Sequence, residues 1–210
     1  MSKPKILPPD WYFKDPSAAA AELIGKIIIR VVADKKRLSC RITETEAYYG
    51  PDDPASRARK GGDLREVMKG PPGHALVYGI HRQWLFNVVS HKIGEYGAVL
   101  IRSCEPLEGI ELMKANRGTD NIFLLTTGPG RLTQALLIDK GFHKKPVFTQ
   151  KYGLWIERGP PVRKKDIVRT WRIGVTEDLE TPLRFVLVTS RFISKPPGVK
   201  GSWRMKEKGM

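Results

Sequence analysis

The sequence has few cysteines and no long apolar run, and each of these absences excludes a class of protein. Its 210 residues include only Cys40 and Cys104, too few for a disulfide framework, and no Cys-x-x-Cys or His-x-x-x-His spacing indicates a zinc site. The longest nearly apolar segment, residues 27–32, is far shorter than the roughly 20 residues that a membrane-spanning helix needs. The first residues lack the apolar core of a signal peptide. We therefore expect a soluble, intracellular protein that does not enter a membrane.

Acidic residues are also in short supply. The chain has 22 of them against 37 lysines and arginines, which gives a formal net charge of +15. Such a surplus favours an anionic partner, such as nucleic acid, an acidic membrane surface or a ribosomal setting, because neutralising phosphates releases counterions. A solvated, charged surface explains the surplus equally well. With 40% hydrophobic residues the chain can bury a globular core, and its 4 scattered histidines predict no metal site.

The pattern of apolar residues predicts a single α+β domain, because strands and helices are mixed without strict alternation. We expect helices over 18–23, 63–68, 107–114 and 132–138, and strands over 27–32, 38–48, 77–89, 98–103, 172–175 and 184–188. Since no repeat or low-complexity linker divides the chain, the domain is expected to span 1–194. A basic tail, 195–210, follows it, either as a solvated extension or as an arm that touches phosphate.

The second predicted strand carries carboxylates where apolar side chains begin. The apolar side chains at positions 38, 40 and 42 point to one face, and the same period puts Glu44, Glu46 and Tyr48 on that face. A buried carboxylate must be paired, hydrogen-bonded or shifted in pKa, so this segment is a candidate site for acid or base chemistry. The alternative is that the strand leaves the core near Thr43 and that solvent covers both glutamates.

Cationic and aromatic side chains in two other segments favour a site. An apolar strand ends in Arg102, which could orient a carboxylate or a water molecule. The segment 73–87 mixes flat aromatic rings with His81 and Arg82, a combination suited to stacking on bases and contacting phosphates. Core packing is the ordinary explanation for such an aromatic strand, but it does not account for the two cationic residues within it.

Several separate motifs, in the same order, resemble the alkyladenine (3-methyladenine) DNA glycosylase family. The resemblance extends from about residue 18 to residue 193. Its motifs are Ile-Thr-Glu-Thr-Glu-Ala-Tyr-Tyr-Gly-Pro-Asp-Asp at 42–53, Val-Leu-Ile-Arg at 99–102, Glu-Pro-Leu-Glu-Gly at 105–109, Thr-Gly-Pro-Gly-Arg-Leu at 127–132, Trp-Ile-Glu-Arg-Gly-Pro at 155–160 and Pro-Leu-Arg-Phe at 182–185.

This resemblance implies a compact domain around a curved, mainly antiparallel sheet. It implies an enzyme of base excision repair that flips alkylated or deaminated purines, such as 3-methyladenine and hypoxanthine, out of duplex DNA and hydrolyses the N-glycosidic bond. By the family pattern, Glu46 activates the attacking water as general base and Arg102 helps to position that water. The implied partner is double-stranded DNA containing a damaged purine, the protein is expected to be a monomer, and neither a metal nor a cofactor is expected.

The resemblance also assigns residues that bind the base. Tyr48 and Tyr78 would stack on the flipped base, and Asn87 would exclude the exocyclic amino group of normal guanine. Arg57 stands where better-known members carry a base-contacting histidine. Its guanidinium could read an acceptor such as a purine oxygen, or could turn to phosphate.

The residue that fills the gap left by the flipped nucleotide is less directly assigned. The segment from Tyr78 to Asn87 is one residue shorter than the family pattern. Either the string Tyr-Gly-Ile-His at 78–81 forms the tip that enters the DNA, or His81 or Arg82 fills the gap. Two rivals to the water-using enzyme are a lyase that uses a lysine amine and a non-catalytic nucleic-acid-binding module on the same fold.

Overall fold

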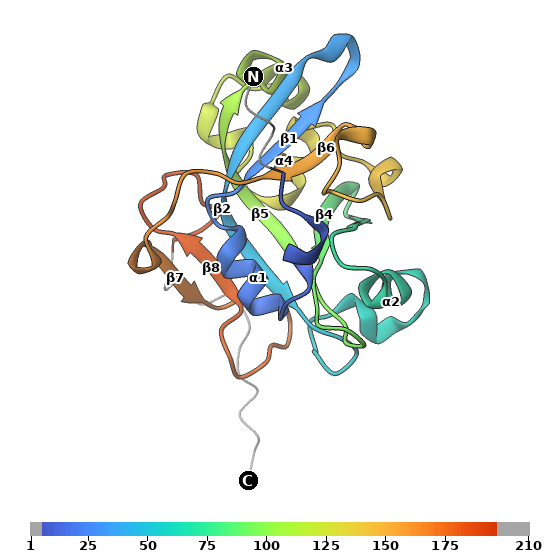
Figure 1. The fold of residues 1–210 in the computed structure, drawn as a ribbon. Helices are drawn as coiled ribbons and strands as arrows, with labels where there is room; N and C mark the ends of the chain where they lie inside the picture. Colours follow the sequence, from blue (N-terminus) through green and yellow to red (C-terminus); the bar gives the residue numbers. More distant parts are fainter. Residues whose placement is uncertain (1–5, 197–210) are drawn as a thin grey trace.

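A single antiparallel sheet of eight strands forms the centre of residues 6–196, the part of the chain that the computed structural model describes (Figure 1). Only the first two residues of the predicted tail, 195–210, belong to this part, and the rest of it lies outside. Six strands follow the order β3-β4-β5-β2-β1-β6, while β8 pairs with β2 and β7. The strands are β1 (Ile27–Val31), β2 (Arg37–Tyr48), β3 (Ala75–Ile80), β4 (Gln83–Val89), β5 (Ala98–Glu108), β6 (Leu154–Glu157), β7 (Ile167–Thr170) and β8 (Arg184–Leu187).

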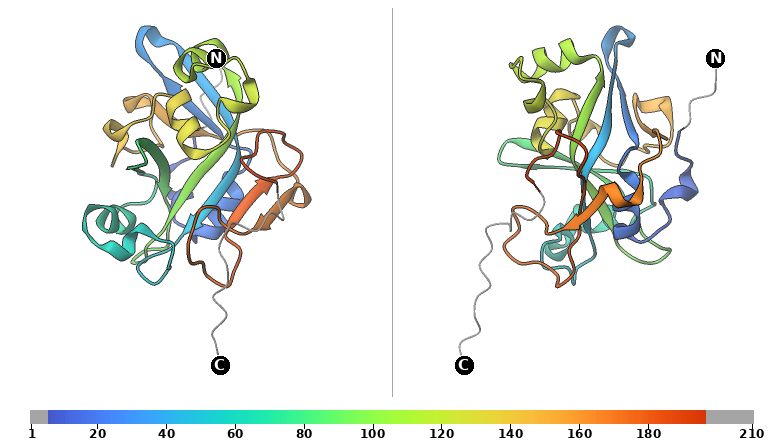
Figure 2. Two further views of the ribbon diagram at one scale, coloured as in Figure 1. Left: turned by 180° about the vertical axis from the view of Figure 1, so that it is seen from behind. Right: turned by 90° about the vertical axis from the view of Figure 1, so that its left-hand side faces the viewer.

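Short helices surround the two longest strands, β2 and β5. Figure 2 shows α3 and α4 near one end of these strands and α2 near the other. The helices are α1 (Pro16–Leu23), α2 (Gly62–Lys69), α3 (Ile110–Arg117) and α4 (Pro129–Ala135). Asp15 begins α1 by accepting hydrogen bonds from the backbone N–H groups of Ser17 and Ala18, at 2.8 and 3.2 Å. No helix within residues 6–196 has the length and apolar character needed to cross a bilayer.

The β2 strand lies at the middle of the sheet, so both of its edges are paired, and side chains on both of its faces are buried. One edge pairs with β5, and the other pairs with β1 through residues 37–41 and with β8 through residues 44–46. Nine of its twelve residues are buried, including the threonines that alternate with the glutamates. Register shifts on both sides of Glu44 interrupt the regular alternation. The predicted burial of the strand is therefore confirmed, but a continuous period of two does not describe it.

Two apolar clusters hold the sheet to its helices. The larger joins α1, α3, α4 and most of the strands. The smaller lies beneath α2, and Tyr48 and Tyr78 pack against it. Its buried members are Ala58, Val67, Met68, Leu76, Val89 and Ala98. The two tyrosines thus stand beside a solid apolar support, which restricts the positions of their rings.

Several predicted elements differ from the observed ones. The strand expected over 77–89 is a hairpin, because the chain turns at His81 and Arg82, both with positive φ (48° and 64°). The helix expected from residue 107 begins at 110, since β5 continues to Glu108 and the left-handed Gly109 precedes α3. The helix expected over 132–138 spans 129–135. The strand expected over 172–175 is wrong, because this segment is irregular and follows β7.

Candidate active site

Both glutamates of β2 are buried. Glu44 and Glu46 have 0% of their surface exposed, and both accept hydrogen bonds from Arg102 of the neighbouring β5 strand. The alternative, in which β2 leaves the core and solvent covers the glutamates, is therefore wrong. Pairing with a guanidinium compensates much of the free energy that is lost when a carboxylate leaves water.

Among residues 6–196, Glu46 finds three hydrogen-bond donors, and its carboxylate has capacity for one more. Its Oε2 accepts from the Tyr48 hydroxyl at 2.8 Å and from Arg102 Nη1 at 3.1 Å, while its Oε1 accepts from the backbone N–H of Ile173 at 2.7 Å. A carboxylate offers about four lone-pair positions. One position on Oε1 therefore remains for a further donor, such as a water molecule.

The groups that contact Glu46 keep their protons. Burial raises the pKa of the Tyr48 hydroxyl, and the adjacent Glu46 carboxylate raises it further, so this phenol donates at neutral pH. For Arg102, burial lowers the pKa, but Glu46 and Glu44 more than compensate and the pKa is raised overall. Arg102 thus remains a cation between two carboxylates, with 7% of its surface exposed.

Strand register brings Asn87 and Tyr78 to the same face as Glu46. In the sheet, Asn87 of β4 and Glu46 of β2 are both opposite Leu100 of β5, and directly opposed residues project to the same side. Asn87 is in turn opposite Leu76, and Tyr78 projects to this side because it follows Leu76 by two positions. The Asn87 amide donates to the Leu76 carbonyl at 3.0 Å, which holds its orientation.

Arg57 lies at the margin of this group. It begins the short 3-10 helix η3 (Arg57–Lys60), and its guanidinium carbon lies 5.9 Å from the centre of the Tyr78 ring. Burial raises the pKa of Tyr78, and Arg57 only partly offsets this effect. The sequence-predicted residues Glu46, Arg102, Tyr48, Tyr78, Asn87 and Arg57 thus lie together on one face of the sheet.

His81 and Arg82 do not join this group. Both are exposed at the turn of the β3–β4 hairpin, three and four positions beyond Tyr78. Neither is a glycine, asparagine or aspartate, the residues that usually occupy a turn with two positive φ angles. A cavity of about 500 Å³ lies beside this turn and extends to α4.

A buried arginine completes the support of the site. Arg172 is fully buried, pairs with Asp53 at 2.7 Å and with Asp178 at 2.5 Å, and its guanidinium carbon lies 4.5 Å from the centre of the Tyr48 ring. It directly precedes Ile173, whose N–H reaches Glu46. Arg172 is not among the residues predicted for the site, and its segment was predicted to be a strand. In a chain with 37 lysines and arginines, nothing distinguishes one internal arginine, although Asp53 lay in the first family motif.

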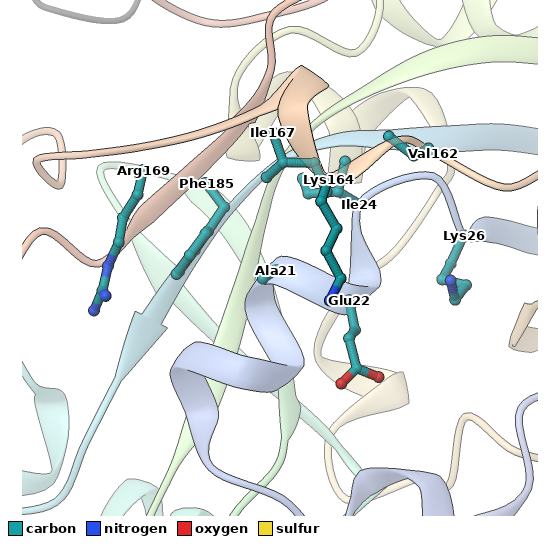
Figure 3. A pocket seen from close by; sticks show the side chains of 9 residues that line it. All are labelled: Ala21, Glu22, Ile24, Lys26, Val162, Lys164, Ile167, Arg169 and Phe185. Carbon is teal, nitrogen blue, oxygen red and sulfur yellow. The ribbon is translucent and has the colours of Figure 1, made fainter.

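Not every cavity belongs to this site. A cavity of about 390 Å³ between α1, β8 and the segment 162–169 is lined by the residues that Figure 3 shows. Its Phe185 is opposite Thr45, whose hydroxyl donates to Ala20 of α1. This cavity therefore lies on the α1 side of the sheet and away from Glu46. Within residues 6–196, no three histidine, cysteine or acidic side chains are grouped so that they could hold a metal ion.

Comparison with known proteins gives one consistent result. The model of the family described as Methylpurine-DNA glycosylase (MPG) matches residues 10–191. A protein of Aeropyrum pernix is 44% identical over 193 residues, which cover 91% of this chain and 94% of that protein. Proteins of Carboxydothermus hydrogenoformans and Gloeobacter violaceus are 41% and 37% identical, over 90% and 89% of this chain and 99% and 85% of their own lengths. All three carry the name "Putative 3-methyladenine DNA glycosylase".

Proposed function

The chain belongs to the methylpurine-DNA glycosylase family, and we propose from this that it is a monofunctional DNA repair enzyme that releases 3-methyladenine and related damaged purines from duplex DNA. The observation that carries the proposal is the buried Glu46, held by Arg102 and Tyr48 on the sheet face that also presents Tyr78 and Asn87. The enzyme would act as a monomer on DNA inside the cell.

In this proposal, Glu46 activates the water that cleaves the glycosidic bond. The free acceptor position on Oε1 takes a proton from the water, the water oxygen bonds to C1′ of the sugar, and the bond from C1′ to the base nitrogen breaks with its electron pair going to the base. An alkylated, cationic purine leaves as a neutral molecule, so it needs no acid, whereas hypoxanthine leaves more readily once protonated. A positioned general base commonly contributes about 10²- to 10⁴-fold in rate.

In this proposal, the damaged purine is recognised by stacking on tyrosine rings and by steric exclusion of normal guanine. A base cannot react while it is stacked in the duplex, and a damaged base costs less to unstack than a normal one. Tyr48 and Tyr78 offer flat faces next to Glu46, and the Asn87 amide would collide with the amino group of guanine. Arg57, above Tyr78, would contact an acceptor on the base or an adjacent phosphate.

Duplex DNA would be held by the positive charge and opened at the β3–β4 hairpin. The net charge of +15 supplies affinity for any sequence, because phosphate contacts carry little base selectivity. The exposed His81 and Arg82 project from the end of the hairpin, and one of them would occupy the gap that the flipped nucleotide leaves.

A panel of duplexes tests the proposal. Each duplex carries one lesion, among them 3-methyladenine, 7-methylguanine, hypoxanthine and ethenoadenine, and release of the base is scored as alkali-sensitive strand cleavage. We expect release of at least one alkylated purine and no covalent adduct after borohydride treatment, because no lysine amine takes part. Binding to lesion duplexes without release of any base would instead identify a non-catalytic DNA-binding module.

A further inference from the structure

The second buried carboxylate, Glu44, is saturated with hydrogen bonds. Its Oε1 accepts from Arg102 Nε at 3.0 Å, Arg184 Nε at 2.8 Å and the Ser194 hydroxyl at 2.7 Å. Its Oε2 accepts from the Ser103 hydroxyl at 3.0 Å and from the Ser194 backbone N–H at 2.6 Å. Five donors occupy about four lone-pair positions, so no position remains for a water molecule. Glu44 therefore cannot be the base, unlike Glu46.

The charge of Glu44 is also held in place. Burial raises its pKa, but Arg102 and Arg184, together with the Ser194 hydrogen bonds, lower it by more, so the pKa lies below its ordinary value. Arg184 is itself fully buried, and its Nη1 has no hydrogen-bond partner among residues 6–196. Glu44 and Arg184 are therefore a fixed anion and a fixed cation. They lie next to Glu46 and Arg102, the proposed catalytic residues.

The last described residues of the chain close this network. Besides the two Ser194 contacts, Arg184 Nη2 donates to the carbonyl of Lys195, and the Thr43 hydroxyl donates to the carbonyl of Phe192 at 2.5 Å. Residues 192–195 thus bind to β2 and β8 directly behind Glu44. The predicted boundary at residue 194 divides this contact, since Lys195 takes part in it.

We propose that Glu44, with Arg184 and Ser194, is a positioning group that determines how Arg102 meets Glu46. Because Glu44 holds Nε of Arg102, only Nη1 contacts Glu46, and a lone pair of Glu46 stays available. Without the Glu44 charge, the Arg102 guanidinium is free to form a bidentate ion pair with Glu46, as arginine and carboxylate groups commonly do. That pair would occupy the acceptor position that the water needs. This inference rests on the proposed function of Glu46.

The full-length Glu44→Gln variant tests this role, with Ser194→Ala as a milder second variant. For Glu44→Gln we expect the single-turnover rate of base release to fall by about 10- to 100-fold, while affinity for the lesion duplex changes by less than about threefold, because the loss is one of alignment. Ser194→Ala slows release by about two- to tenfold, the effect of one hydrogen bond, and Ser194→Thr restores it.

Ser90→Ala is the matched control. The Ser90 hydroxyl is buried and donates to the Tyr12 carbonyl at 2.8 Å, so its loss costs a comparable hydrogen bond away from the site. We expect this variant to lose stability but to keep the rate of base release and the affinity for the lesion duplex. The inference is overturned if Glu44→Gln folds and retains the wild-type rate of base release, or if its loss of rate only matches that of an equally destabilised Ser90→Ala. If Glu44→Gln does not fold, equal rates for Ser194→Ala and wild type overturn it. Release of no base by the wild-type protein would overturn the proposed function as well.

Discussion

Replacing Glu46 with glutamine separates catalysis from folding in this protein. A glutamine has one acceptor oxygen, whereas Glu46 uses both of its oxygens. If the amide oxygen stays with Tyr48 and Arg102, the amide nitrogen faces the N–H of Ile173, and one buried donor loses its acceptor. Such a loss costs about 1–3 kcal/mol of unfolding free energy. Most domains tolerate this cost, so we expect Glu46→Gln to fold.

The expected effect on the reaction is larger. Removal of the general base should slow base release by about 10²- to 10⁴-fold. At about 1.4 kcal/mol for each tenfold, the activation free energy rises by about 2.7–5.5 kcal/mol. The rings and the positive charge that would hold the lesion duplex are unchanged, so we expect its affinity to stay within about tenfold of wild type.

Single-turnover release of a damaged purine, with enzyme in excess over a duplex carrying one lesion, measures the rate, and fluorescence anisotropy measures binding. Glu105→Gln is the matched control, because Glu105 lies on β5, is half-buried and pairs with Arg41 at 2.8 Å. Its rate should stay within about twofold of wild type, because Glu105 is opposite Arg41, five positions along β2 from Glu46. A Glu46→Gln variant that releases the base within about threefold of the wild-type rate would refute the assignment of Glu46 as the base.

Four further outcomes can be measured. Arg172→Met leaves two buried aspartates unpaired, so chemical denaturation should show a loss of about 3–5 kcal/mol in unfolding free energy, and an unchanged value would contradict this. The pKa of Glu44 lies below its ordinary 4.5, because the effect of its two arginine partners outweighs that of burial. The contribution of Glu44 to stability is therefore complete above about pH 4.5 and is lost as the pH falls further. Chemical denaturation at pH 3 and pH 6 checks this. The double change His81→Asn and Arg82→Gly should relieve the strained turn and stabilise the fold by about 1 kcal/mol. The same change should slow base release if His81 or Arg82 occupies the gap that the flipped nucleotide leaves in the duplex. Arg57→His should change the ratio of rates between lesions by about tenfold without abolishing release, and identical ratios across the panel would argue against a contact between Arg57 and the base.

Local patterns along the chain were sufficient to predict the main part of the candidate site. Alternation along β2 predicted that Glu44 and Glu46 are buried, and both are. The position of Arg102 at the end of an apolar run indicated that it could orient a carboxylate or a water molecule, and it contacts two carboxylates. The resemblance to one family was specific because several separate motifs occur along the chain in the same order as in that family.

Turn and strand ends were predicted less well because they depend on neighbours distant in sequence. Pairing of β3 with β4 compels the chain to turn at His81 and Arg82, although neither residue favours positive φ. β5 continues through Pro106, where a register shift leaves one extra residue on β5 between the partners of Ser39 and Cys40, whereas local propensity alone ends the strand earlier.

The sequence by itself determined the family, the α+β class, the charge and the identity of the proposed base. Only the tertiary structure decided which groups surround that base. The N–H of Ile173, the ion pair of Arg172 with Asp53 and the contact of Ser194 with Glu44 join segments about 120 to 150 residues apart along the chain. No local periodicity encodes such contacts, because they form only when the sheet brings distant loops together and burial requires each charge to find a partner.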